Sequence, residues 1–239
     1  MSKCWVISDI HGCIHTLRTL IENQIVPSKE DKLIFLGDYI DRGPGSKSVL
    51  DYVMQLEDNG YSIIALKGNH EEFLVKSYET QKQLKNFWFY KEANRSLEMW
   101  MRHGGKEALE SFEVSDVEEI PSHYIDWINK RPLYFETEKF FIVHAGLNFE
   151  IDNPFEDEQA MTWIREYKVV PEKINFRRLI HGHVPVSLDF IDLTIKSSGY
   201  QFIDLDNGCY MANKPGFGNL IGLELNSMEL KVQSNLDFE

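Results

Sequence analysis

The sequence predicts an α/β protein in which short buried strands alternate with helices. Short apolar runs recur along the first third of the chain, and each run ends abruptly in polar residues. Apolar residues at helical spacing separate these runs, and such an alternation is typical of a parallel sheet. In parallel sheets, ligands gather beyond the carboxyl ends of the strands. The polar residues that follow each run are therefore the first candidates for function.

The expected elements follow one another along the chain. Buried strands are expected at 4–7, 33–36, 63–66, 140–143 and 178–180. The polar residues directly after them are Ser8-Asp9, Gly37-Asp38, Lys67-Gly68-Asn69, His144 and His181-Gly182-His183. Helical spacing fills 14–21 and 49–56. The remaining apolar runs, at 201–203, 219–225 and 229–232, are expected to form antiparallel strands.

A different pattern interrupts the strands between about 73 and 130, where helical spacing and aromatic residues dominate. We expect an inserted helical lobe with a small core of its own. The chain shows no internal repeat, low-complexity tract or obvious linker. Residues 1–239 should therefore form a single domain that carries this helical insertion.

Composition limits the class of function. The formal net charge of -13 disfavours nucleic acid and anionic membranes as partners. The three cysteines are scattered, which argues against a disulfide framework or a cysteine zinc site. No apolar run approaches the length of a membrane span, and the N-terminus turns acidic at Asp9 before a signal-peptide core could develop. A cytoplasmic enzyme is expected, and the oligomeric state stays open.

Five of the strand ends carry clusters of Asp, His, Asn or Arg. Each cluster alone has an ordinary explanation, such as a capping Asp or a hydrogen-bonded structural His. Together they would crowd carboxylates and imidazoles into one buried place, which is very costly without a compensating cation. Imidazole, carboxylate and amide ligands suit Mn, Fe, Zn or Co. A pair of such ions needs a bridging carboxylate and activates a shared water for attack on phosphorus.

Three blocks resemble the signature motifs of one family. They are Asp9-Ile10-His11-Gly12, Gly37-Asp38-Tyr39-Ile40-Asp41-Arg42-Gly43 and Gly68-Asn69-His70-Glu71. They look like those of the bacterial-type phosphoprotein phosphatases, which belong to the calcineurin-like metallophosphoesterases. His144-Ala145-Gly146 and Gly182-His183 occur in the expected order. The resemblance implies a β-sandwich flanked by helices (α/β/β/α), with the inserted helical lobe.

The resemblance also implies roles for individual residues. The implied metal ligands are Asp9, His11, Asp38, Asn69, His144 and His183, with Asp38 bridging both ions. His70 would be the general acid held by Asp41, and a metal-bridging hydroxide would attack the phosphate. The phosphate itself would be bound by Arg42, Arg165 and Asn69. Mn²⁺ is the expected metal, with Fe or Zn as alternatives. His181 is interpreted as a structural residue near the site.

Two substrates stay open. A serine/threonine protein phosphatase, also active on small phosphate esters, is the first hypothesis. The alternative is a symmetrical diadenosine tetraphosphatase of the same fold, which would need aromatic and basic residues for the nucleotide. The helical lobe offers Trp88, Tyr90, Lys91 and Trp100 for that purpose, although packing is their simpler explanation. A silent phosphate-binding scaffold is disfavoured, because such a protein has no reason to keep His70 beside an intact metal site.

Overall fold

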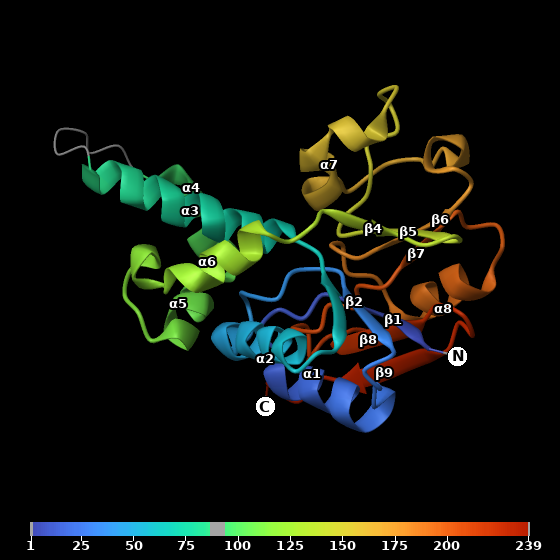
Figure 1. Ribbon diagram of the computed structural model, residues 1–239, viewed down its shortest axis with the longest axis horizontal. Coiled ribbons are helices and arrows are strands. Elements are labelled where there is room, and N and C mark those ends of the chain that lie inside the picture. Colours follow the sequence, from blue (N-terminus) through green and yellow to red (C-terminus); the bar gives the residue numbers. More distant parts are fainter. Residues whose placement is uncertain (1, 87–93, 239) are drawn as a thin grey trace.

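The computed structural model of the chain describes residues 2–86 and 94–238 (Figure 1). Within these ranges the strands form two sheets, ordered β3-β2-β1-β8-β9 and β4-β5-β6-β7. The first sheet consists of β1 (Cys4–Ile7), β2 (Lys32–Phe35), β3 (Ser62–Ala65), β8 (Asn219–Glu224) and β9 (Leu230–Ser234). The second consists of β4 (Tyr134–Glu136), β5 (Phe140–Val143), β6 (Arg178–His181) and β7 (Phe202–Asp204). This two-sheet architecture confirms the predicted fold.

The core between the sheets is built by side chains that alternate along each strand. In β1, Val6 belongs to the inter-sheet core, whereas Trp5 and Ile7 pack on the opposite face with residues of the helices. In β5, Ile142 belongs to the same inter-sheet core, and Phe141 belongs to a third cluster beyond the second sheet. Because both faces of these strands are covered, they appear in the sequence as short continuous apolar runs.

The described residues also form eight α-helices, some of which cover the outer faces of the two sheets. They are α1 (Ile14–Thr19), α2 (Ser46–Asp58), α3 (Asn69–Asn86), α4 (Arg95–Trp100), α5 (Lys106–Phe112), α6 (Ser122–Asn129), α7 (Glu158–Trp163) and α8 (Leu188–Lys196). Shorter helical turns occupy Leu20–Ile25, Met101–Gly105, Val117–Glu119, Pro154–Glu156 and Pro171–Ile174. Figure 1 shows α1 and α2 against the first sheet and α7 beyond the second. Among the described helices, none is both long and apolar enough to cross a membrane.

The helical segment between β3 and β4 extends away from the sheets in Figure 1. Its first helix begins at Asn69, a few residues before the expected start near 73, so that it carries the third signature block in its first turn. Trp88, Tyr90 and Lys91 lie outside the described residues. Trp100 is fully buried, so it is not available for stacking on a nucleotide base. The suggestion that Trp100 could bind a nucleotide base is therefore wrong.

The direction of one strand differs from expectation. The runs at 219–225 and 229–232 do form antiparallel strands, since β8 pairs antiparallel with both β1 and β9. The run at 201–203 does not, because β7 pairs parallel with β6, with Leu179 opposite Phe202. Helix α8 connects β6 to β7, as parallel neighbours require. The antiparallel expectation is wrong there because this helix was not recognised in the sequence.

Candidate metal centre

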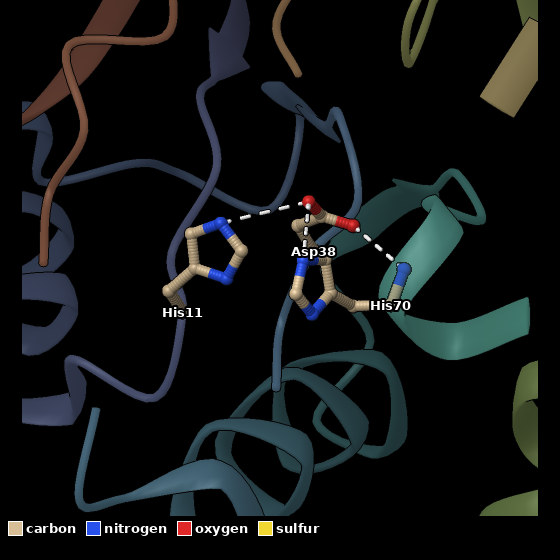
Figure 2. A group of neighbouring side chains, drawn as sticks. All are labelled: His11, Asp38 and His70. Atoms are coloured by element: carbon tan, nitrogen blue, oxygen red, sulfur yellow. Dashed lines mark hydrogen bonds and ion pairs between the residues drawn. The ribbon is translucent and has the colours of Figure 1, made fainter. Parts of the chain in front are cut away.

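Asp38 lies at the middle of the candidate site, directly beyond β2. Its carboxylate Oδ2 is 3.5 Å from Nε2 of His11 and 3.9 Å from Nε2 of His70 (Figure 2). Its other oxygen, Oδ1, is 3.5 Å from Nε2 of His144. Asp38 therefore takes part in two groups of residues that could each hold a metal ion, one with His11 and His70 and one with His144 and His183.

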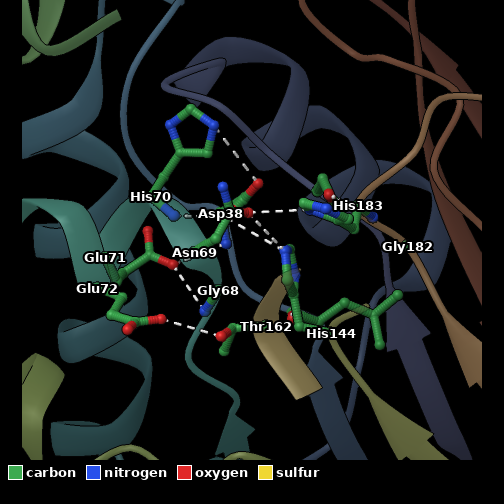
Figure 3. Close-up of polar contacts among 12 residues, drawn as sticks. Asp38, Gly68, Asn69, His70, Glu71, Glu72, His144, Thr162, Gly182 and His183 are labelled. Atoms are coloured by element: carbon green, nitrogen blue, oxygen red, sulfur yellow. Dashed lines mark hydrogen bonds and ion pairs between the residues drawn. The ribbon is translucent and has the colours of Figure 1, made fainter. Parts of the chain in front are cut away.

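The loops after β3, β5 and β6 supply the second group. The Asn69 side-chain oxygen lies 3.0 Å from Nε2 of His144 and 3.0 Å from Nδ1 of His183. Figure 3 shows these three side chains converging on Asp38 from different elements. Asp9, beyond β1, accepts a 2.9 Å hydrogen bond from the backbone N–H of His183. The structure thus brings all six predicted ligands together from five separate loops.

The ring nitrogens of two histidines are oriented by backbone carbonyls. The carbonyl of Ile40 lies 3.1 Å from Nδ1 of His11, and the carbonyl of Leu36 lies 3.0 Å from Nδ1 of His144. A carbonyl oxygen only accepts hydrogen bonds, so it favours the proton on Nδ1 and leaves a lone pair on Nε2. Both Nε2 atoms face Asp38. This is the hydrogen bonding that metal-binding histidines require.

Three further observations fit a pair of cations. Oδ1 of Asp9 and Nε2 of His183 are buried and have no hydrogen-bond partner among the described residues. Burial, and then the neighbouring His144, lowers the pKa of His183 to about 3, so its imidazole is neutral and can bind a metal. Although burial opposes its charge, the surrounding imidazoles hold the pKa of Asp38 well below its usual range. The donor set therefore fits two ions that share Asp38.

His70 lies beside this centre, and a hydrogen bond on the far side of its ring fixes its orientation. Its Nδ1 donates a 2.6 Å hydrogen bond to Asp41. The indole of Trp100 donates to the same carboxylate, at 2.9 Å and 3.0 Å from its two oxygens. Burial disfavours a charged imidazole, but Asp38 and Asp41 outweigh it and raise the pKa of His70. Its Nε2 remains directed at the centre, where it can hold a proton or a metal.

Of the two predicted phosphate-binding arginines, Arg42 contacts the centre directly. The Arg42 guanidinium is 2.9 Å from Nε2 of His11 and 3.1 Å from Nε2 of His70, and it stacks 4.3 Å from the Tyr210 ring centroid. Arg165 is exposed, and its charge contributes to the lowered pKa of His183. Arg42 therefore borders the side of His11 and His70, whereas Arg165 follows Trp163, whose ring centroid is 6.5 Å from that of His183.

Sequence reasoning missed the role of Glu71. This buried carboxylate accepts hydrogen bonds from the backbone N–H groups of Gly68 (3.0 Å), Asp38 (2.8 Å) and Tyr39 (2.8 Å), so it ties two ligand loops together. Burial, and then Asp38, raises the pKa of Glu71 to about 8. Its place beside Asn69 and His70 in the third block was the only available signal. His181 is buried at the end of β6 and belongs to neither metal-binding group, and its structural role stays a prediction.

Backbone strain is concentrated at the site. His11, Asp38, Asp41, Arg42 and His183 all have positive φ angles, between 49° and 75°. Residues with a Cβ rarely adopt this conformation, and each costs on the order of 1–3 kcal/mol unless the surroundings enforce it. The cluster therefore indicates that these loops are shaped for the positions of their side chains rather than for stability.

A close approach at Gly182 leads to a testable expectation. A Cβ at this position would lie 2.2 Å from Oδ1 of Asp9. In Gly182→Ala we expect displacement of Asp9 and an activity loss of about 10²-fold, the effect of a misplacement of about 1 Å. Steady-state rates and bound metal should be measured together. Gly199→Ala, whose new Cβ would meet its nearest neighbour at 3.4 Å, is the matched control. Wild-type activity and metal content in Gly182→Ala would contradict this expectation.

Comparison with known proteins agrees with this geometry. Residues 2–200 match the family model of calcineurin-like phosphoesterases. A curated relative from Methylobacillus flagellatus, named symmetrical bis(5'-nucleosyl)-tetraphosphatase, is 31% identical over 144 residues. That match covers 60% of this chain and 43% of the relative, so the chain corresponds to less than half of that protein's length.

Solved structures share the fold at low sequence identity. A candidate diadenosine tetraphosphatase superposes with a TM-score of 0.67 at 16% identity, over 99% of this chain and 95% of that one. A serine/threonine phosphatase from Saccharomyces cerevisiae gives 0.63 at 13% identity, over 100% of this chain and 81% of that one. At these identities the likeness concerns the fold alone. Because the family model spans most of its length, the chain belongs to the calcineurin-like phosphoesterase family.

Proposed function

We propose that the chain hydrolyses dinucleoside tetraphosphates symmetrically, with diadenosine tetraphosphate as the model substrate. The main observation behind this proposal is that two potential metal sites share Asp38, as a phosphoesterase with two metal ions requires. The name shared by its curated relatives supports this substrate over the phosphoprotein that the sequence first favoured. Because those matches cover less than half of the relatives' length, the substrate is a proposal for this chain.

The residues proposed to hold the metal ions form two sets around Asp38. The first is Asp9 with His11, and the second is Asn69 with His144 and His183. When bound there, two divalent cations would lower the pKa of a water molecule and offset the negative charge of the phosphate. We propose Mn²⁺, because imidazole, carboxylate and amide donors suit it, with Fe and Zn as alternatives.

The proposed reaction adds the oxygen of a water molecule to a phosphorus atom in the middle of the tetraphosphate. The bond breaks between this phosphorus and the oxygen that links it to the other middle phosphorus, so that two nucleoside diphosphates are released. We propose that His70 gives a proton to the departing oxygen, because Asp41 fixes its ring and, against the effect of burial, Asp38 and Asp41 raise its pKa. We propose that Arg42 and Arg165 bind non-bridging oxygens of the reacting phosphate.

A group of aromatic side chains beside the centre supports a substrate with a planar base. Phe73 is stacked on His103 with ring centroids 5.3 Å apart, and it meets the edge of Trp163 at 4.6 Å. Trp163 lies 6.5 Å from the ring of His183, so the group borders the proposed second metal position. All three rings are partly exposed. Base stacking on such rings is worth about 1–3 kcal/mol per base.

A substrate panel tests the proposal. Diadenosine tetraphosphate, a phosphothreonine peptide and p-nitrophenyl phosphate should each be incubated with Mn²⁺, Zn²⁺, Fe²⁺ and Mg²⁺. We expect the highest kcat/KM for diadenosine tetraphosphate, with ADP as the sole nucleotide product by anion-exchange chromatography. Formation of ATP and AMP would contradict symmetrical cleavage. A higher kcat/KM for the phosphothreonine peptide would instead restore the protein phosphatase hypothesis.

The same panel with Trp163→Ala separates base recognition from chemistry. Loss of a stacking ring should raise KM for diadenosine tetraphosphate by about 5- to 160-fold, the range that about 1–3 kcal/mol implies. The kinetic constants for p-nitrophenyl phosphate, which lacks a base, should stay close to wild type and serve as the internal control. Equal losses for both substrates would mean that Trp163 acts only through its hydrogen bond to Glu72.

A further inference from the structure

The turn after β7 carries a buried carboxylate for which the proposed chemistry gives no role. Asp206 is fully buried, and its Oδ1 accepts a 2.7 Å hydrogen bond from the backbone N–H of Gly208. Its Oδ2 is also buried but has no hydrogen-bond partner among the described residues. A buried carboxylate oxygen without a partner is expensive, so its retention requires an explanation.

The turn holds Asp206 in a fixed position. The side chain of the next residue, Asn207, donates to the carbonyls of Val186 (2.8 Å) and Gly216 (2.9 Å). It also accepts a hydrogen bond of 2.7 Å from the Asn219 side chain. Gly208 follows with a φ of 62°, which completes the turn. Asp206 is therefore presented by a rigid support, as residues of functional sites commonly are.

The turn that carries Asp206 lies beside the loop after β6 that carries His183. Strand β7 pairs parallel with β6, and the backbone N–H of Val186 in that loop donates a 2.8 Å hydrogen bond to the carbonyl of Asp206. The same loop also holds Asp9, because the backbone N–H of His183 donates to its Oδ2. Burial raises the pKa of Asp9 well above its usual range, and the neighbouring charge of Asp206 raises it further. Asp9 also has a buried oxygen, Oδ1, without a partner among the described residues. Two buried carboxylates thus lie beside the same loop, and each has one oxygen without a hydrogen-bond partner among the described residues. Like charges in such a place repel strongly unless a cation lies near both.

We propose that Asp206 belongs to the metal centre, where its Oδ2 provides negative charge and an oxygen donor, directly or through one water, to the cation held by Asp9 and His11. This inference deepens the proposed function and rests on it for the presence of metal. With Asp9 and Asp38 as the only carboxylates, two dications would keep a surplus of positive charge. A third carboxylate reduces that surplus and should strengthen binding of the first ion.

The competing explanation is that Asp206 only closes the turn through its bond to Gly208. Asp206→Asn separates the two roles, because the amide oxygen can still accept the Gly208 N–H while the negative charge is lost. Asp204→Asn is the matched control. Asp204 is also buried at the end of β7, and its Oδ1 accepts the backbone N–H of Asp206 at 3.1 Å, which an amide oxygen can also do.

The experiment is a calorimetric titration of each metal-free protein with Mn²⁺, combined with thermal melts without and with Mn²⁺. For Asp206→Asn we expect one of two ions to bind about 10–100-fold more weakly, the effect typical of losing a supporting metal-site group. The metal-free variant should melt at the wild-type temperature or higher. Its melting temperature should rise less on adding Mn²⁺ than that of the wild type does. Asp204→Asn should bind both ions nearly as wild type does.

Two results would overturn the inference. One is Asp206→Asn binding both ions with wild-type affinity. The other is a metal-free variant that melts at a lower temperature than the wild type but whose melting temperature rises by the same amount on adding Mn²⁺. That result is expected if Asp206 only stabilises the turn. Neither depends on substrate. If the wild type binds two Mn²⁺ ions but cleaves no dinucleoside tetraphosphate, the proposed function is wrong. The titration with Mn²⁺ still decides whether Asp206 belongs to the metal centre.

Discussion

Asp38→Asn is expected to abolish turnover and to weaken binding of both metal ions. Among the residues that the structure describes, Asp38 is shared by the two potential metal-binding groups, and its two oxygens face different histidines, His11 and His144. A neutral amide presents one oxygen and no charge, so it bridges two dications poorly. The loss of metal affinity should exceed the ~10–100-fold that removal of an outer-shell partner typically causes.

Metal content by mass spectrometry and kcat on the best substrate of the panel should be measured on the same sample of Asp38→Asn. The matched control is Asp192→Asn, because Asp192 has a side chain that is 49% exposed and forms an ion pair with Lys196. That variant should keep wild-type metal content and rate. Full activity and two bound ions in Asp38→Asn would remove the central assumption of the proposed function.

His70→Asn is expected to retain both metal ions and to lose rate. Its Nδ1 is committed to Asp41, and its Nε2 faces the centre at 3.9 Å from Asp38, so it can serve as a proton donor. General acid catalysis is typically worth about 10²–10⁴-fold. The full loss is expected for a phosphothreonine peptide, whose leaving alkoxide needs a proton. The loss should be smaller for diadenosine tetraphosphate and p-nitrophenyl phosphate, whose leaving groups are weaker bases.

The alternative role of His70 is metal binding, since it forms a potential ligand group with His11 and Asp38. Metal content decides between the two roles. A fall in bound metal that accompanies the fall in rate would show that His70 is a ligand. An equal loss of rate for all three substrates, with metal retained, would contradict general acid catalysis.

Much of the site could be predicted because each ligand follows a short apolar run. Runs such as 4–7 and 140–143 mark strands that are buried on both faces, and the residues after them lie at strand ends. The nearness of His144 to Asp38 could not be derived in this way, since it depends on how the two sheets pack through Val6 and Ile142. The nearness of these two residues was predicted only from the resemblance to a known family.

Other features depend on contacts that leave no pattern in a single sequence. Glu71 was visible beside His70, but its hydrogen bonds to two loops exist only once those loops have folded together. Trp100 was expected to pack, and it does, yet its hydrogen bond to Asp41 joins residues far apart in the chain. Asp206 likewise lies beside the loop of His183 only through the parallel pairing of β7, which the sequence did not reveal.

The indole of Trp100 makes the alignment of His70 depend on the helical segment between β3 and β4. Exchanging this segment between relatives is an obvious way to alter selectivity. A chimera without an indole donor at this position would leave Asp41 without one of its hydrogen bonds, and proton transfer would change along with substrate choice. Grafted segments should therefore keep this tryptophan, and the pH–rate profile of a chimera reports whether the graft preserved the connection.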